Sequence, residues 1–523
     1  MTRLHISHGD LQISDGLLEL KDDGPRDTLI ATGDSVRDIA ILEAMIASGI
    51  RRIGLDTRAA PLIVKDQTVH LDNAWLFPVG VSEADVRLLD RSMLRWGTYI
   101  SWSKVDQGST PCLVASDRRS LSLAPPAVLP AVGSMLCVMS DDVLDIVPHI
   151  RGGTNRPQEL VRVQSIVGTD IVLDRPLEDS YVTNARCTVM PRPILGGGME
   201  GIDFSQSENG AEGLLQGIGV YGADGWHCRH ITMANTGSMN VYLSDNTLIE
   251  NLAINGQQLT KSIYGVASVC NGRFRISGYQ GWGCRHMFTT GGYDDGQRNR
   301  YGTNPQHVIE NFDWVMNETQ SASAVAGAGD THAEGLGVVF RDGQIRYAGK
   351  ADYASPAGTL YGIHGRSRRQ RIERVRFLGD HSQKCIGVLL DGDRDTVVRD
   401  CEFEDLIIGC IVRNVGDRQG MPACQRTLIQ ESRFKNIRNE AVLFNGGDGH
   451  MVDRCAIDGA GIRTGGYFGS KQTAVTFNDH GNVGISNVTV RGTTIHAPAA
   501  QAPIWIHPSL PSDQVSLIQN CIY

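Results

Sequence analysis

The main pattern in this chain is a short alternation of apolar and polar positions that recurs along its second half. The motif is an apolar residue, two polar or small residues, an apolar residue, any residue and an apolar residue. Full copies read IENLAI, IENFDW, IERVRF, VRDCEF, IQESRF, VDRCAI and ISNVTV, beginning at Ile249, Ile309, Ile372, Val398, Ile429, Val452 and Ile485. Degenerate copies at Phe274 and Gln344 complete a spacing of 22 to 38 residues. Alternation of this kind predicts short, half-buried strands.

A second apolar run precedes many copies of the motif and ends in a polar turn. These runs are VYLSDN, HMFTTGG, VLLDGD, VLFNGGD and VTFNDHG, beginning at Val241, His286, Val388, Val442 and Val475. Each repeat therefore contains at least two strands and a polar corner. A unit of this size cannot bury its apolar face alone, so neighbouring units must stack. Constant strands with loops of variable length predict an all-β solenoid, a parallel β-helix.

Other repeat architectures fit this pattern less well. The LxxLxL consensus of leucine-rich repeats is absent. Propeller blades need four strands and a longer period, and the alternation and the glycine content argue against a helical solenoid.

The part of the chain before the repeats predicts a cap and a small insertion. Ser35 opens a helix, with Asp38 three residues later as an approximate capping box. The helix carries an apolar stripe, ends near Gly49 and is followed by strands in 50–55, 61–66 and 68–77. Further strands are predicted at Tyr99–Trp102, Met135–Met139, Leu160–Val167 and Ile171–Leu173, between turn residues.

Together these patterns predict five segments. They are an N-terminal arm (1–33), a capping helix with the first strands (34–85), a small β insertion (86–195), the parallel β-helix (196–497) and a C-terminal tail (498–523). The glycine triplet that begins at Gly196 marks the boundary before the β-helix.

Composition changes this picture in a few respects. The 60 glycines and 6% aromatic residues suit many turns between short strands, and an elongated solenoid accommodates 523 residues without several separate cores. A net charge of −9 argues against nucleic acid and anionic membranes as partners, so a polyanion would need a local basic patch. The 12 cysteines form no CxxC pair and are expected to be buried and unpaired. No motif indicates a metal or another cofactor, and none is expected.

The N-terminal sequence MTRLHISHGD lacks the apolar core of a signal peptide, and no stretch is long enough to span a bilayer. We therefore expect synthesis in a cytoplasm without classical secretion. An extracellular role would then require another route, such as release in a virus particle.

Several of these features resemble the pectate-lyase-like superfamily, and most closely the bacteriophage tailspike depolymerases. The resemblance is carried by the helix at 35–48, the segment 134–190, the repeats of 220–497, and TTGG with DTHAEG between His286 and Glu334. It implies a right-handed parallel β-helix closed by the helix, a polysaccharide substrate, and a location on the virion tail or outside the cell. It also implies a homotrimer, and the Pro-rich end from Ala497 could extend over a neighbour or fold back as a plug. Because this superfamily includes lyases, hydrolases and epimerases, the reaction type stays open.

Two near-identical motifs, GWHCRH at 225–230 and GWGCRH at 281–286, lie about two coils apart. They predict either a repeated turn with Trp and Cys packed inside, or a sugar-binding surface that presents Trp226 and Trp282. The second motif runs into a long loop with the polar and aromatic residues Tyr293, Asp294, Asp295, Arg298, Arg300 and Tyr301. Such a loop is either solvated or functional.

Two further segments carry candidate chemistry. In GDTHAEG, the residues Asp330, His332 and Glu334 share one face of an extended chain, where they could perturb each other's pKa or simply fix a turn. One coil later, HGRSRRQRIERVR contains six arginines and begins at His364. It is either a solvated edge or a carboxylate-binding patch, to which Arg366 and Arg368 contribute because they lie nearest the corner.

These residues lead to a functional hypothesis, a depolymerase that cleaves an acidic bacterial surface polysaccharide by β-elimination. A base must remove the C5 proton, a cation must stabilise the enolate, and an acid must protonate the leaving oxygen. The candidates are His286 or His332 as base, Arg285, Arg298 or Arg366 as cation, and Tyr293 or Tyr301 as acid. Substrate contacts are assigned to Trp226, Trp282, Asp294, Asp295, Arg298, Arg300, His364, Arg366 and Arg368.

Two alternatives remain open at this stage. A glycoside hydrolase would use a carboxylate pair, with Asp330 and Glu334 the first choice and Asp294 or Asp295 the next. A non-catalytic adhesin or virion fibre would bind the polysaccharide without cleaving it. The sequence does not identify the sugar, the linkage or the host.

Overall fold

The computed structural model describes the backbone of 4–6, 9–14, 17–21 and 26–518, except 126, 147–152, 192–193, 209–216, 257–263, 318–325, 349–359, 380–384, 414–423, 462–470, 480–483, 501, 512 and 514. The chain forms two compact units. The first comprises 1–144, 156–280 and 290–307, and the second comprises 145–155, 281–289 and 308–523.

The predicted helix is present in the first unit as α1 (Ser35–Ala47), but its cap differs from the prediction. The Asp34 carboxylate accepts the N–H groups of Val36 and Arg37, at 3.0 and 3.2 Å. Asp38 turns away from the predicted capping box and accepts hydrogen bonds from the N–H and the hydroxyl group of Thr32. The capping box is therefore wrong, because a nearer carboxylate already satisfies the free N–H groups of the first turn.

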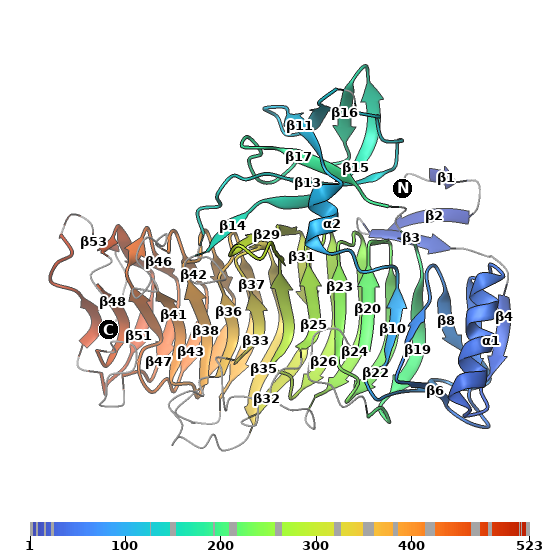
Figure 1. Cartoon of the computed structure of the whole chain (residues 1–523). Coiled ribbons are helices and arrows are strands. Elements are labelled where there is room, and N and C mark those ends of the chain that lie inside the picture. Colours follow the sequence, from blue (N-terminus) through green and yellow to red (C-terminus); the bar gives the residue numbers. More distant parts are fainter. Residues whose placement is uncertain are drawn as a thin grey trace. The chain divides into compact units, whose positions relative to one another are not determined.

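Parallel strands form the body of the first unit (Figure 1). One sheet contains β7 (Thr68–His70), β10 (Met93–Trp96), β20 (Gly217–Tyr221), β23 (Ser238–Tyr242) and β25 (Tyr264–Val269). A second set contains β4 (Arg26–Ile30), β5 (Arg52–Asp56), β8 (Trp75–Pro78), β19 (Gly198–Phe204), β22 (His227–Ala234) and β24 (Thr247–Asn255). The strands β6 (Leu62–Lys65) and β9 (Ala84–Leu89) also pair in parallel. Within the predicted arm, β1 (Leu4–Ile6), β2 (Gly9–Ser14) and β3 (Leu17–Lys21) form an antiparallel sheet.

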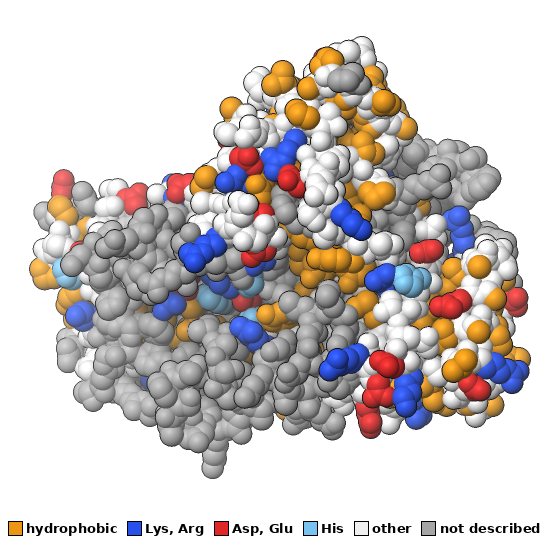
Figure 2. Space-filling model, in the orientation of Figure 1, with side chains coloured by type: hydrophobic (Ala, Val, Ile, Leu, Met, Phe, Trp, Pro, Cys, Tyr) orange, Lys and Arg blue, Asp and Glu red, His pale blue; other side chains and the backbone are white. Residues whose placement is uncertain are grey.

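A small closed barrel of antiparallel strands lies within the predicted insertion. Its strands are β11 (Thr110–Val114), β12 (Ser120–Leu123), β13 (Met135–Met139), β15 (Gln158–Val167), β16 (Asp170–Leu173) and β17 (Arg186–Val189). The strand predicted at Tyr99–Trp102 is wrong, because Trp102 begins the short helix α2 (Trp102–Gln107). Figure 2 shows hydrophobic side chains on the barrel surface, and Leu113, Val128 and Val182 are strongly exposed.

The second unit contains the later repeats, again as parallel strands in sequence order. One sheet consists of β33 (Ala326–Thr331), β36 (Leu360–Gly365), β38 (Cys385–Asp391), β41 (Ile408–Arg413), β44 (Val442–Asn445), β48 (Thr473–Asn478) and β52 (Ala502–Ile506). The alternating motif forms β35 (Val339–Ala348), β37 (Arg371–Leu378), β39 (Val397–Arg399), β40 (Glu402–Glu404), β42 (Leu428–Gln430), β43 (Arg433–Lys435), β46 (Met451–Asp453), β47 (Ala456–Asp458) and β50 (Val488–Arg491). Two later strands, β51 (Thr494–His496) and β53 (Val515–Ile518), pair with β47 and β50.

Both units thus consist of coils of a right-handed parallel β-helix, which confirms the predicted fold class. The alternating motif directs its apolar positions inward, so that the burial of β37 and its neighbours alternates along each strand. Part of the predicted tail also pairs with the coils, as β52 on β48 and β53 on β50. These residues of the tail therefore fold back onto the chain's own coils, which was one of the two alternatives predicted for the tail.

Stacked rings line the interior of the second unit. The rings of Phe377 and Phe403 are 4.8 Å apart and those of Phe403 and Phe434 are 4.6 Å apart, nearly parallel in both cases. These phenylalanines occupy the last apolar position of three successive motifs. Of the 12 cysteines, the 11 that the structure describes are buried, and no disulfide joins any two of these 11. No helix in the described ranges is long and apolar enough to cross a membrane.

Candidate functional site

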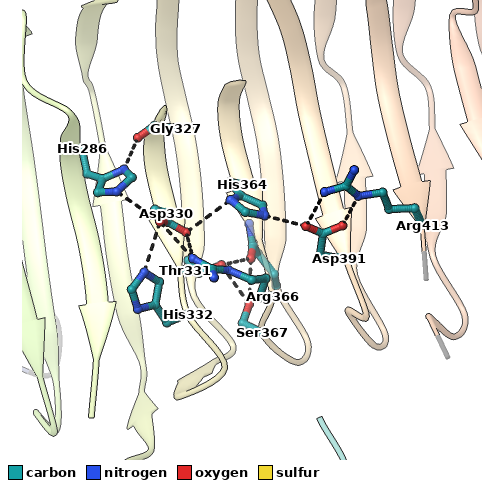
Figure 3. Close-up of polar contacts among 11 residues, drawn as sticks. His286, Gly327, Asp330, Thr331, His332, His364, Arg366, Ser367, Asp391 and Arg413 are labelled. Atoms are coloured by element: carbon teal, nitrogen blue, oxygen red, sulfur yellow. Dashed lines mark hydrogen bonds and ion pairs between the residues drawn. The ribbon is translucent and has the colours of Figure 1, made fainter. Parts of the chain in front are cut away.

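The Asp330 carboxylate lies at the centre of a polar cluster in the second unit (Figure 3). Arg366 donates through Nη2 to both carboxylate oxygens, at 2.7 and 3.0 Å. His332 donates from Nε2 at 3.1 Å, and the Nε2 atom of His286 lies 3.3 Å away. The Nδ1 atom of His364 is 3.7 Å from the other oxygen. One buried carboxylate is therefore surrounded by three imidazoles and a guanidinium.

Strand register brings these residues together. Asp330 on β33 lies between Thr289 of β27 (His286–Gly291) and His364 of β36, and all three residues are in register. Stacked parallel strands place residues in register about 4.8 Å apart. A backbone hydrogen bond from the Arg366 N–H to the Thr331 carbonyl continues the pairing beyond the strand end. Distant segments of sequence thus supply side chains to one place.

A second carboxylate extends the cluster by two coils. The Nε2 atom of His364 lies 2.8 Å from an oxygen of Asp391, at the end of β38. Arg413, in register with Asp391 on the neighbouring strand β41, donates to both oxygens of that carboxylate. Neither Asp391 nor Arg413 was predicted as a site residue from the sequence. The run VLLDGD marked the strand, but the variable loops between coils conceal the register that joins these two positions.

Burial and charge set the ionisation of the cluster. Burial alone would raise the pKa of Asp330, but Arg366 and the histidines outweigh it and hold this pKa well below its usual value. Burial lowers the pKa of His286 to about 4, against the opposing effect of Asp330. Burial likewise lowers the pKa of His332. Near neutral pH, Asp330 is therefore ionised while His286 and His332 are neutral.

The members of the cluster differ in their access to solvent. The side chains of Asp330 and His286 are only 4% and 2% exposed. The side chains of His332, Arg366 and Arg413 are 13%, 16% and 23% exposed. A substrate would thus meet His332 and the two arginines, with Asp330 behind them.

Several other predicted residues lie close to this cluster. Glu334 is fully buried, and its charge acts on both His332 and Arg366. Arg285, next to His286, is partly buried, and its charge helps to lower the pKa of His286. Arg368 belongs to a ladder of corner bridges between Leu336 and Arg394.

The two tyrosines predicted as acids have structural roles instead. Tyr293 is buried and donates its hydroxyl to the Ile100 carbonyl, while burial raises its pKa well above the usual value. Tyr301 is buried too, and its hydroxyl donates to Asp141. Both hydroxyl groups are thus occupied within the first unit, which contradicts their assignment as proton donors.

The polar residues of the long loop form a hairpin turn. Its strands are β28 (Tyr293–Asp294) and β29 (Asn299–Tyr301). Asp294 accepts from the Gly296 N–H, and Asp295 accepts from the Asn299 side chain. Arg300 donates to the Gly292 carbonyl, and Arg298 is exposed with a positive φ of 68°. Asp294 and Asp295 therefore accept hydrogen bonds within the turn, which gives both carboxylates a structural role that the sequence did not predict.

The two tryptophan motifs fall at different points of their coils. Trp226 precedes β22, is buried, and packs edge-on against Trp96 at 5.4 Å. Trp282 ends β26 (Phe274–Trp282) and is 36% exposed. The predicted sugar-binding role of Trp226 is therefore wrong, because its indole belongs to the core, while Trp282 remains a candidate contact.

In the part of the chain that the structure describes, no group of three or more His, Cys, Asp or Glu residues is arranged to hold a metal ion. The chemistry available at the cluster is proton transfer by imidazole and anion binding by guanidinium.

Comparison with solved structures relates this fold to known proteins. The tailspike of Pseudomonas phage phi297 is 12% identical, with 91% of this chain and 75% of that chain covered and a TM-score of 0.54. This chain has the β-helix fold of that tailspike. An Acinetobacter baumannii bacteriophage AP22 tailspike in complex with capsular saccharide is 12% identical over 91% and 76% of the two chains, with a TM-score of 0.46. A Thermotoga maritima exopolygalacturonase is 11% identical over 95% and 90%, with a TM-score of 0.33.

No protein-family model and no curated protein sequence matches the chain.

Proposed function

We propose that this protein is a depolymerase that binds and cleaves an acidic polysaccharide of the bacterial surface by β-elimination. The observation that supports this proposal is the Asp330 cluster, in which a neutral histidine and an arginine with unused donors lie side by side. β-Elimination needs a base for the C5 proton and a cation beside the uronate carboxylate. Both groups are present and partly exposed.

Arg366 is suited to the role of the cation. It uses Nη2 for Asp330, whereas its buried Nε has no hydrogen-bond partner among the described residues. A guanidinium with donors left over can bind a second carboxylate in the same plane. The uronate carboxylate of an acidic sugar would bind the exposed part of this guanidinium, whose side chain is 16% exposed, and would place the negative charge of the enolate next to a fixed cation.

His332 is the better of the two predicted bases. Its hydrogen bond to Asp330 orients the ring, and its low pKa leaves it neutral and able to accept a proton at pH 7. His286 is neutral as well, but it is buried and its Nδ1 donates to the Gly327 carbonyl at 2.7 Å. His286 therefore serves better to support Asp330 than to reach the substrate.

Hydrolysis by Asp330 and Glu334 is the alternative. It requires one of the two carboxyl groups to donate a proton to the leaving group. Asp330 is held ionised by Arg366 and His332, so Glu334 would have to be that donor. Glu334 is fully buried, whereas His332 and Arg366 are partly exposed, and this difference in access to a substrate favours β-elimination.

The deciding experiment is incubation of the protein with a panel of purified capsular polysaccharides and exopolysaccharides. β-Elimination produces an unsaturated uronate, which absorbs in the ultraviolet, and new reducing ends in equal number. New reducing ends without this absorbance would indicate hydrolysis and would contradict the lyase assignment. Binding without new ends, for example in a pull-down with the same polymers, would identify a non-catalytic adhesin or fibre.

We also propose that the protein acts as a homotrimer on a virion tail. The proposal is supported by the tailspike fold and by the exposed apolar side chains of the small barrel.

A further inference from the structure

Arg394 is a corner arginine of the second unit that was not predicted as a site residue from the sequence. It follows β38, and its backbone forms a parallel bridge with Arg368 of the preceding coil. Arg368 lies two residues after Arg366. Two residues span at most about 7 Å and adjacent coils are about 4.8 Å apart, so the Cα atoms of Arg366 and Arg394 are at most about 12 Å apart. One bound polysaccharide chain could therefore contact both guanidinium groups.

These arginines face the outside of the coils. Ser367, between Arg366 and Arg368, is fully buried, and so is Asp393, the residue before Arg394. The side chains of Arg366 and Arg394, by contrast, are 16% and 17% exposed. Arg394 thus offers a ligand about the same access as the cation proposed for the elimination.

The carboxylate that Arg394 contacts differs in burial from the one that Arg366 binds. Asp330, the partner of Arg366, is only 4% exposed and belongs to the coils. The Nη2 atom of Arg394 lies 2.6 Å from an oxygen of Asp145, whose side chain is 72% exposed. An ion pair with such an exposed partner contributes little to stability. A carboxylate from solution could therefore replace Asp145, whereas it could not replace Asp330.

The next acid along the chain does not compete for Arg394. Asp395 is bonded through both of its carboxylate oxygens to Arg426. Asp145, in contrast, reaches Arg394 from the segment 145–155, which lies outside the stacked strands of the second unit. The outer part of the Arg394 guanidinium is thus already placed to bind a carboxylate that comes from outside the coils.

We propose that Arg394 is a carboxylate-binding subsite for the polysaccharide, and that Asp145 occupies this subsite when no substrate is bound. The ligand is the carboxylate of a second uronate unit, close to the unit that loses its C5 proton. This inference rests on the proposed function. It implies that the protein prefers polymers whose acidic units are closely spaced, because only these can contact Arg366 and Arg394 together.

Two substitutions that break the same ion pair should have opposite effects. Arg394→Gln should raise KM by about 10-fold or more, because a charged hydrogen bond to the substrate is lost. Its kcat should not change, since this contact is made equally before and in the transition state. Asp145→Asn should lower KM by about 2- to 5-fold, because the competing charge is removed. If the pair only anchored the segment 145–155, the two variants would change KM in the same direction.

Arg426→Gln is a matched control. Arg426 is a corner arginine of the next coil, and its side chain is 54% exposed and bonded to Asp395. Its replacement removes the same positive charge as Arg394→Gln, but KM should stay within about 2-fold of the unmodified protein. A rise in KM as large as that of Arg394→Gln would show a general effect of charge and would overturn the subsite.

A titration with sodium glucuronate at constant ionic strength measures binding without catalysis. In 15N spectra, the Nε–H signal of Arg394, assigned by its loss in Arg394→Gln, should shift with glucuronate and not with glucose. The shift should occur at lower glucuronate concentrations in Asp145→Asn. A signal that does not shift with glucuronate, or KM changes of the same sign in the two variants, overturns the subsite. Absence of cleavage by the unmodified protein overturns the proposed function instead, while the titration still reports on Arg394.

Discussion

At the scale of single residues, the cluster shows how a buried charge is retained in a β-helix. Asp330 is removed from water, but it receives hydrogen bonds from Arg366 and His332 that replace its hydration. A buried carboxylate without such donors would be neutral instead. The same principle explains why Asp391 is ionised beside Arg413. Two residues later, Asp393 has no arginine side chain bonded to it among the described residues, and burial raises its pKa.

The first prediction concerns the proposed base and cation. His332→Gln should reduce kcat by about 10²- to 10⁴-fold, because the variant lacks a proton-accepting imidazole. Arg366→Lys should reduce kcat/KM by about 10²-fold or more, because the planar guanidinium can hold Asp330 and a second anion in a fixed geometry and the point charge of an ammonium group cannot. Both values come from initial rates of unsaturated uronate formation.

His496→Gln provides the control, since His496 ends β51 and is exposed. It should retain full activity. Full activity of His332→Gln would exclude this histidine as the base and would favour the carboxylate mechanism.

The second prediction concerns Asp393, a fully buried acid. Burial raises its pKa to about 8, against a hydrogen bond from Thr396, and its Oδ2 has no partner among the described side chains. The folded protein therefore holds a proton that the unfolded chain releases near pH 4. As the pH rises from about 5 to 8, the free energy of unfolding should fall by up to about 1.4 kcal/mol per pH unit from this group.

Chemical denaturation at several pH values tests this expectation. Asp393→Asn should remove most of this slope, whereas Asp395→Asn in the same coil should preserve it. Equal slopes in the unmodified protein and in Asp393→Asn would show that Asp393 does not titrate in this range.

The sequence predicted several site residues because they lie at strand ends within recognisable motifs. Asp330 and His332 share one short segment, and Arg366 follows His364 in the arginine-rich segment one coil later. The spacing of the repeat was therefore enough to predict that Asp330, His332 and Arg366 lie close together. Asp391 and Arg413 were missed because their partnership depends on register across a variable loop. Tyr293 and Tyr301 were misassigned because composition cannot reveal that each hydroxyl group is already bonded.

At the scale of elements, a row of glycines accompanies the row of stacked phenylalanines. A Cβ atom at Gly387 would lie 2.6 Å from both the Phe403 ring and the Gly409 carbonyl oxygen. A Cβ atom at Gly409 would lie 2.6 Å from both the Phe434 ring and the Ala441 carbonyl oxygen. Neither glycine needs an unusual φ, so the reason for glycine is space and not backbone conformation. The absence of a side chain on one strand makes room for a ring from the opposite sheet.

The third prediction tests this packing with a double-mutant cycle. Gly387→Ala should lower the free energy of unfolding by about 1–3 kcal/mol, because it overfills a close-packed interior. Phe403→Leu should also destabilise the protein. The two changes together should cost less than their sum, since the smaller side chain relieves the contact of the added methyl group with the ring, although not its contact with the Gly409 carbonyl oxygen. Urea denaturation measures all four proteins, and strict additivity would contradict the proposed contact.

The elements themselves were largely predictable. The alternating motif located β37 and the strands that follow it, because period two is the direct consequence of one buried face. The helix α1 was predicted to within one residue at its C-terminal end, although its cap was not. The closed form of the small barrel was not predictable, since it depends on pairing between strands that are distant in sequence.

At the scale of the whole molecule, the fourth prediction is association into a trimer. Light scattering at micromolar concentration should give three times the chain mass of 56.8 kDa. The barrel offers a contact surface, because Leu113, Val128 and Val182 expose apolar side chains. Replacing these three residues with Ser should weaken the association without unfolding the coils. A monomer at the same concentration would contradict the trimer.

The position of the barrel has a consequence for how such proteins change over generations. The chain leaves the stack after β10 and rejoins it at β19, while β10 pairs directly with β20. The stack does not depend on the barrel for its hydrogen-bonded register, so a gene could lose, lengthen or exchange this segment as a cassette. Selection could then alter the attached module separately from the cluster at Asp330, so that one of them changes while the other persists.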